Sequence, residues 1–152
     1  MIIRKAKEED IEECVGLAVG MIKESWWKEA PFCSQKMRDY AYRALENDNK
    51  LYLVAEEDDQ IYGFFAATLT ETFFGHEIHA EQDLMYVKPE NRKGMTGVKF
   101  LRENEIWARK NNAQHIYFAP TATQRTVGRI VSKAWVHISW PSLWQKTVRT
   151  TP

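Results

Sequence analysis

Three strand-like segments follow one another in the middle of the chain without a helix between them. Residues 51–55, 61–69 and about 77–87 are rich in apolar side chains, and polar turns separate them. Pro89 ends the third segment, because proline offers no backbone N–H to a sheet. Consecutive strands joined by short turns predict an antiparallel meander.

Helical patterns lie on both sides of this meander. Apolar residues recur at offsets of three and four over residues 11–22 and 37–45, and again over 97–108. Asp10 precedes the first pattern, and we expect Ser34 to cap the second helix. The third helix starts near Gly94 to Gly97 and therefore returns the chain from the meander to a further strand.

The remaining elements are shorter. We expect strands at 2–6 and 115–119, a helix at 127–134, and a closing hairpin of 136–139 with 143–148. The order βααβββαβαββ predicts an α/β fold, with a mixed, mostly antiparallel sheet of about six or seven strands and about four flanking helices. No repeat, low-complexity tract or linker interrupts the chain, so residues 1–152 are expected to form a single domain.

Composition and charge exclude several classes of protein. The 21 basic and 21 acidic residues cancel, which argues against a protein held by nucleic-acid phosphates. No apolar run approaches the roughly 20 residues of a membrane helix, and the first residues lack the apolar segment of a signal peptide. Cys14 and Cys33 form no disulfide framework, so we expect free thiols, a cytoplasmic protein, and neither a membrane nor a nucleic acid as partner.

Residues 84–98 combine the features of an anion site. A strand ends, Pro89 follows, and a basic turn containing Gly94 opens a helix near Gly97. The first amides of a helix are unpaired and carry partial positive charge, to which Arg92 and Lys93 add full charges. This pattern suits a phosphate or diphosphate. The alternative is that both glycines serve only the turn and the packing of the helix.

Three segments resemble the GNAT superfamily of acyl-CoA-dependent N-acyltransferases: residues 4–10, 85–92 and 108–113. The resemblance implies acetyl-CoA as cosubstrate and no metal. It also implies the residues that bind it, which are Tyr86, Val87, Arg92, Lys93, Gly94, Met95, Thr96, Gly97 and Gln124. The family loop is usually Arg/Gln-x-x-Gly-x-Gly/Ala, so Arg92 and Gly97 match while Met95 replaces the first glycine. Val131 stands where the family usually has a tyrosine, and valine cannot protonate a thiolate.

The resemblance further implies direct transfer to an amine, with backbone amides at the end of the fourth strand binding the thioester carbonyl. A carboxylate takes the amine proton in such a reaction. Glu81 lies nearest the family's base position, and Asp83 should share its face of the strand. Both could instead be solvent-facing, or could bind a cationic substrate. Tyr117 and Tyr86 are the candidate acids, and water is the alternative.

Other conspicuous residues favour plainer interpretations. His76 and His79 have no third ligand nearby, so surface histidines are expected. Five aromatic residues are expected to pack within the fold rather than to line a substrate site: Trp26, Trp27, Phe32, Phe73 and Phe74. The C-terminal tryptophans, Trp135, Trp140 and Trp144, suggest a homodimer contact.

The function expected from the sequence is therefore acetylation of a small-molecule or peptide amine. One alternative is a degenerate domain that binds acyl-CoA with little transfer, which Met95 and Val131 support. A second is a protein-interaction domain that uses the tryptophan-rich end. A single-strand nucleic-acid binder is a third, against which the zero net charge argues.

Overall fold

The computed structural model describes residues 1–118 and 144–147. Its strands are β1 (Ile2–Lys5), β2 (Lys50–Glu57), β3 (Gln60–Glu71), β4 (Ile78–Val87), β5 (His115–Phe118) and β6 (Trp144–Thr147). Its helices are α1 (Ile11–Lys23), α2 (Ser34–Glu46) and α3 (Thr96–Lys110), with short 3-10 turns at Glu8–Asp10 and Pro89–Asn91. The predicted helix at 127–134 and strand at 136–139 lie outside the described residues.

The strands form one six-stranded sheet in the order β1-β2-β3-β4-β5-β6. All neighbours are antiparallel except β4 and β5, which are parallel because α3 carries the chain back between them. The predicted mixed sheet and antiparallel meander are therefore confirmed within the described residues. The strand β6 falls inside the predicted range 143–148 and pairs with β5.

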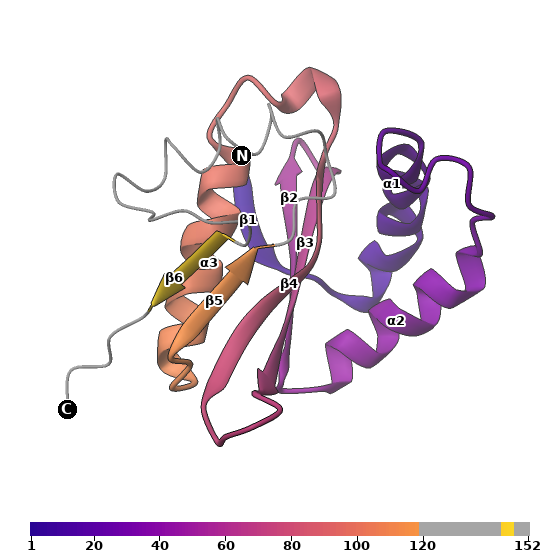
Figure 1. The fold of residues 1–152 in the computed structure, drawn as a ribbon. Coiled ribbons are helices and arrows are strands. Elements are labelled where there is room, and N and C mark those ends of the chain that lie inside the picture. Colours follow the sequence, from indigo (N-terminus) through magenta and orange to yellow (C-terminus); the bar gives the residue numbers. More distant parts are fainter. Residues whose placement is uncertain (119–143, 148–152) are drawn as a thin grey trace.

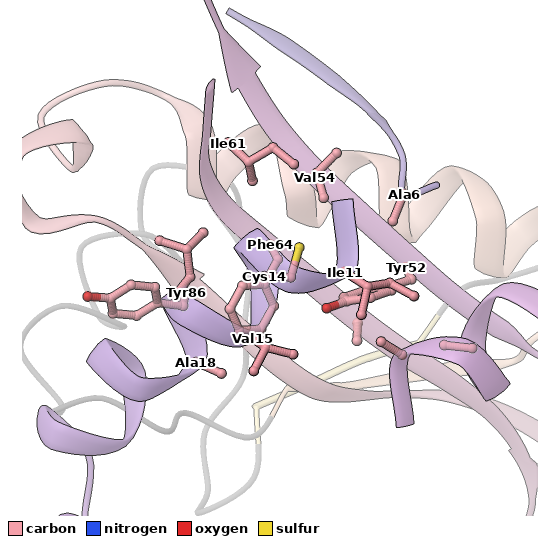
Figure 2. Close-up of a cluster of buried hydrophobic side chains, with 14 of the residues drawn as sticks. Ala6, Ile11, Cys14, Val15, Ala18, Tyr52, Val54, Ile61, Phe64 and Tyr86 are labelled. Atoms are coloured by element: carbon pink, nitrogen blue, oxygen red, sulfur yellow. The ribbon is translucent and has the colours of Figure 1, made fainter. Parts of the chain in front are cut away.

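Helices cover both faces of the sheet: α1 and α2 lie on one side and α3 on the other (Figure 1). Each side has its own apolar cluster. Cys14, Val15 and Ala18 of α1 face Phe64 and Tyr86 of the sheet (Figure 2). The α3 side instead buries Phe65 beside Phe100, with ring centroids 5.9 Å apart. The apolar stripes predicted for the helices are thus the faces that pack on the sheet.

Two local predictions need correction. Ser34 does not cap α2, since it is the first helical residue and the cap position belongs to Cys33, which makes no side-chain capping bond. The turn predicted at 56–60 is shorter, because Asp58 and Asp59 form it alone with φ angles of 52° and 59°. Two left-handed residues match the twist of paired strands, so β2 and β3 continue almost to the turn.

A buried ion pair joins β1 to the start of α1. Arg4 donates to both carboxylate oxygens of Asp10, over 2.6 and 2.9 Å, and the Lys7 N–H donates to Oδ2 over 2.7 Å. Burial opposes the charge of Asp10, but these hydrogen bonds outweigh it and leave its pKa below the usual range. Asp10 therefore fixes the entry into α1 as an ionised carboxylate.

Candidate active site

One extra residue in β4 changes which side chains face each helix layer. Ala66 pairs with Leu84 and Ala67 with Gln82, so Asp83 is a β-bulge with no partner of its own on β3. Before the bulge, Ala80 packs on the α3 side; after it, Val87 does, while Tyr86 turns toward α1. Glu81 and Asp83 therefore face the side of α1 and α2 together, as predicted.

The described pairing of β4 with β5 ends next to this bulge. It runs from His79 with His115 to Glu81 with Tyr117. From Asp83 to Val87, β4 has a strand partner on one side only, β3, within the described residues. We refer to the other side of β4 over this segment as the opening, and backbone donors on that side are suited to a ligand.

The direction of those donors follows from the ladder. The Lys88 N–H donates to the Tyr62 carbonyl over 2.8 Å. Amides alternate in direction along a strand, so Tyr86 also points its N–H at β3, while Met85 and Val87 point theirs toward the opening. Tyr86 and Val87 were both predicted to bind acetyl-CoA; of the two, Val87 thus presents its amide to the opening and Tyr86 does not. Met85 was missed, because the sequence alone does not give the phase of the ladder.

The turn after β4 carries free amides. Within the described parts of the chain, the N–H groups of residues 93–98 donate to no backbone acceptor, and α3 begins at Thr96. Gly94 does not have a positive φ, and a Cβ added there would meet nothing within 4 Å. Neither turn geometry nor packing requires glycine at 94, which weakens the purely structural alternative for this residue. Met95 is 46% exposed beside it.

Arg92 is already engaged. Its Nε donates to the Val87 carbonyl over 2.7 Å, and its Nη1 lies 2.7 Å from Glu24 Oε2. The Tyr86 hydroxyl donates to the other oxygen of Glu24 over 3.0 Å, and the Arg92 guanidinium lies 5.3 Å from the Tyr86 ring centre. Burial, with the Glu24 hydrogen bond next, raises the pKa of Tyr86, which makes it a weaker acid candidate.

The other residues of the loop that were predicted to bind the cosubstrate differ in their exposure to solvent. Lys93 is exposed, whereas Thr96 and Gly97 are buried. The Thr96 hydroxyl lies 3.5 Å from that of Tyr62 and donates to Met1 Sδ over 3.2 Å, so only its amide is available. Gln124 and Val131 lie outside the described residues.

Asp83 is held by α2 and β3. Its Oδ2 accepts from the Tyr40 hydroxyl and the Thr68 hydroxyl, each over 2.5 Å, and Lys50 Nζ lies 3.6 Å away. Burial, then the hydrogen bond to Asp83, raises the pKa of Tyr40 well above its usual range. The Asp83 side chain is 25% exposed, and both of its described hydrogen bonds go to Oδ2. A carboxylate fixed on one oxygen by two hydroxyl donors and an ion pair is suited to binding a cation through the other oxygen.

Glu81 is less constrained and lies beside two rings. Its side chain is 53% exposed, with Oε2 at 3.8 Å from His79 Nε2. The Tyr117 ring packs edge-on against His79 at 4.9 Å between centres. The expectation of a surface histidine is wrong for His79, whose side chain is 14% exposed and whose Nδ1 is buried without a partner in the described chain. Sequence offered no signal for this contact beyond the spacing of His79 and Glu81.

Several exposed aromatic residues correct the packing interpretation. Trp26 and Trp27 are 77% and 63% exposed, and Phe73 and Phe74 are 107% and 92% exposed. Phe32 alone of the group packs against the α1 side. No group of three metal-ligating side chains occurs among the described residues.

The family can be assigned from the sequence as a whole. A profile described as "Acetyltransferase (GNAT) family" matches residues 5–128. The chain belongs to this family. No curated protein sequence matches it.

Solved GNAT structures share the fold along nearly the whole chain. Ribosomal-protein-alanine N-acetyltransferase from Brucella melitensis has a TM-score of 0.80 at 18% identity, covering 97% of this chain and 100% of its own. A putative acetyltransferase from Salmonella typhimurium, solved with acetyl-CoA, gives 0.79 at 15% identity over 100% and 97%. An aminoglycoside 6'-N-acetyltransferase from Acinetobacter haemolyticus gives 0.71 at 17% identity over 100% and 98%. At such identities the likeness establishes the fold alone.

None of the helices in the described part of this GNAT chain is both long enough and apolar enough to cross a lipid bilayer.

Proposed function

We propose that the protein is an N-acetyltransferase that moves an acetyl group from acetyl-CoA to an amine by direct attack. The observation that carries this proposal is that the end of β4, which pairs with β3 alone in the described part of the chain, continues into a bend whose amides have no backbone acceptor there. Membership of the GNAT family and a solved neighbour holding acetyl-CoA support the same assignment.

The residues present fit such a cosubstrate. Gly94 leaves open space where a side chain would stand, and the amides of 93–98 are available to the oxygens of a diphosphate. Lys93 and Arg92 supply positive charge, and the inward amides of Met85 and Val87 are suited to a thioester carbonyl. Acetyl-CoA would contribute an acetyl group already activated as a thioester.

We assign different roles to the two carboxylates. Glu81 is exposed, can change its rotamer, and lies close to His79. It is therefore the better base for the amine proton. Asp83 is held in place by two hydroxyl donors on one oxygen, so it is the better binder of an ammonium group. Tyr117, which pairs with Glu81 across β4 and β5, is the candidate donor of a proton to the departing thiolate.

The acceptor is an amine of unspecified class, either a small molecule or a peptide. The structural neighbours include proteins named for acting on the alanine of a ribosomal protein and on aminoglycosides. The amine panel therefore includes both peptides and small molecules. Two free cysteines, one buried and one exposed, are consistent with a cytoplasmic location. The homodimer predicted from the C-terminal tryptophans remains a prediction, since their side chains lie outside the described part.

Two measurements test the proposal. Titration calorimetry should detect CoA binding to the wild-type chain, and Arg92→Glu combined with Gly97→Asp should abolish it. Thiol release from acetyl-CoA should then appear with at least one member of an amine panel that spans peptides, polyamines and amino sugars. Glu81→Gln should reduce that rate most below the pKa of the substrate amine, where a base is needed to remove the proton.

A degenerate acyl-CoA binder is the second candidate, and Met95 favours it, because its side chain stands at the usual glycine position of the family loop. CoA binding without thiol release across the whole panel would support this candidate. No CoA binding at all would contradict both.

A further inference from the structure

The arginine of the bend meets a carboxylate of its own chain. Glu24, the residue that ends α1, lies 2.7 Å from Arg92 Nη1, although 68 positions separate them in the sequence (92 − 24). The Tyr86 hydroxyl holds the other oxygen of Glu24. An anion that reaches the bend therefore meets an arginine whose charge is already balanced.

We propose that Glu24 competes with the cosubstrate for Arg92: it occupies Arg92 in place of the CoA diphosphate and releases it when CoA binds. Glu24 thereby lowers the affinity for CoA. This inference rests on the proposed function, because it requires that the bend bind CoA.

The way in which Arg92 is held indicates that Glu24 competes with the CoA diphosphate for it and is not needed to keep it in place. The bond from Nε to the Val87 carbonyl fixes the guanidinium at the end of β4 independently of Glu24. A guanidinium has five N–H donors, and the described residues engage only two of its nitrogens. Arg92 can therefore release Glu24 without leaving its place.

The ion pair is also weak enough to be displaced. The two side chains are 33% and 39% exposed, so water can solvate Glu24 once it is released. Pairs of this exposure contribute little, since screening by water offsets most of their attraction. A diphosphate brings more negative charge than one carboxylate and can also accept from the free amides of the bend.

The test is a cycle of CoA titrations on four proteins: wild type, Glu24→Gln, Arg92→Gln and the double variant. Glutamine keeps an acceptor for the Tyr86 hydroxyl but removes the charge. We expect Glu24→Gln to bind CoA about two- to fivefold more tightly than wild type. In the Arg92→Gln background, the same change at position 24 should bring no gain, because the competition acts through Arg92.

Glu90→Gln is the matched control, because Glu90 is exposed, lies close in sequence to Arg92, and makes no described ion pair with it. It removes the same charge from the same region and should leave the affinity unchanged. A purely structural role for Glu24 would lower the affinity in Glu24→Gln, and that result would overturn the inference. An equal gain in Glu90→Gln, or a gain that persists without Arg92, would overturn it too. Failure of the wild-type chain to bind CoA would instead refute the proposed function.

Discussion

Replacing Gly94 by alanine and by aspartate separates what the fold needs at this position from what a bound anion needs. A Cβ at 94 meets nothing within 4 Å, and the residue does not have a positive φ. Alanine should therefore leave the free energy of unfolding unchanged or raise it by about 0.4–1 kcal/mol, because it restricts the unfolded chain. Aspartate near the start of α3 should be tolerated equally well, since a negative charge there is favourable.

Binding of CoA should respond differently. A carboxylate about 5 Å from a phosphate charge is repelled by roughly 0.8 kcal/mol in water and about 3 kcal/mol at an effective dielectric constant of 20. The site is exposed, so we expect a value between these limits and about tenfold weaker binding of CoA to Gly94→Asp. Titration calorimetry measures the affinity, and thermal unfolding measures the stability.

Two glycines provide the controls. Gly16 is also exposed with open space at its Cβ, so Gly16→Asp adds the same charge away from the bend and should not weaken CoA binding. Gly63→Ala should destabilise the fold by about 1–3 kcal/mol, because its Cβ would stand 2.9 Å from the Tyr86 carbonyl oxygen. Wild-type affinity in Gly94→Asp, or a loss above about 1 kcal/mol in Gly94→Ala, would refute the reasoning.

Three further predictions concern stability. Asp10→Asn should lower the free energy of unfolding by about 1–3 kcal/mol at pH 7. The pKa of Asp10 is lower in the folded than in the unfolded protein. The stability that its ionised form contributes is therefore present above the unfolded pKa of about 3.9 and disappears as the pH falls through the folded pKa. Urea unfolding of both proteins between pH 2 and 7 should thus converge at low pH, and parallel curves would contradict this. Tyr40→Phe should lose about 1–2 kcal/mol with its bond to Asp83, and an unchanged unfolding midpoint would show that this bond contributes nothing. Asn104→Leu should raise the melting temperature by a few degrees, because both amide atoms of Asn104 are buried without a partner among the described residues; a lower melting temperature would count against it.

The periodicity of apolar residues in the sequence was sufficient to predict most of the described fold. The offsets of three and four found the buried faces of α1 and α3, and the apolar segments found the meander, because both patterns arise from burial against the sheet. Cap and turn positions were less predictable. Cys33 takes the cap position that Ser34 was expected to hold, and the Asp58–Asp59 turn adopts left-handed angles that its composition only permits.

The candidate site could be located from sequence but not assembled. The bend at 92–98 follows from local signals, namely a proline, a basic turn and a glycine. Glu24 and Tyr40 reach the site from helices far away in sequence, and no local pattern marks them as partners of Arg92 and Asp83. The exposure of Trp26 is likewise a tertiary property, since an aromatic residue in a loop is compatible with either packing or solvent.

The bulge at Asp83 divides β4 into two segments with different strand partners. Side chains alternate along a strand, so the insertion of Asp83 reverses the phase of everything that follows it. Upstream, β4 pairs with both β3 and β5; downstream, its only strand partner among the described residues is β3, and Tyr86 packs on the α1 side. Deleting Asp83 would leave Met85 and Tyr86 on their present faces, because Gln82 and Leu84 already pair with consecutive residues of β3 and would then alternate as in a regular strand. Loss of Asp83 would therefore straighten β4 and remove the carboxylate that Tyr40 and Thr68 hold, while every apolar residue of the strand kept its present surroundings.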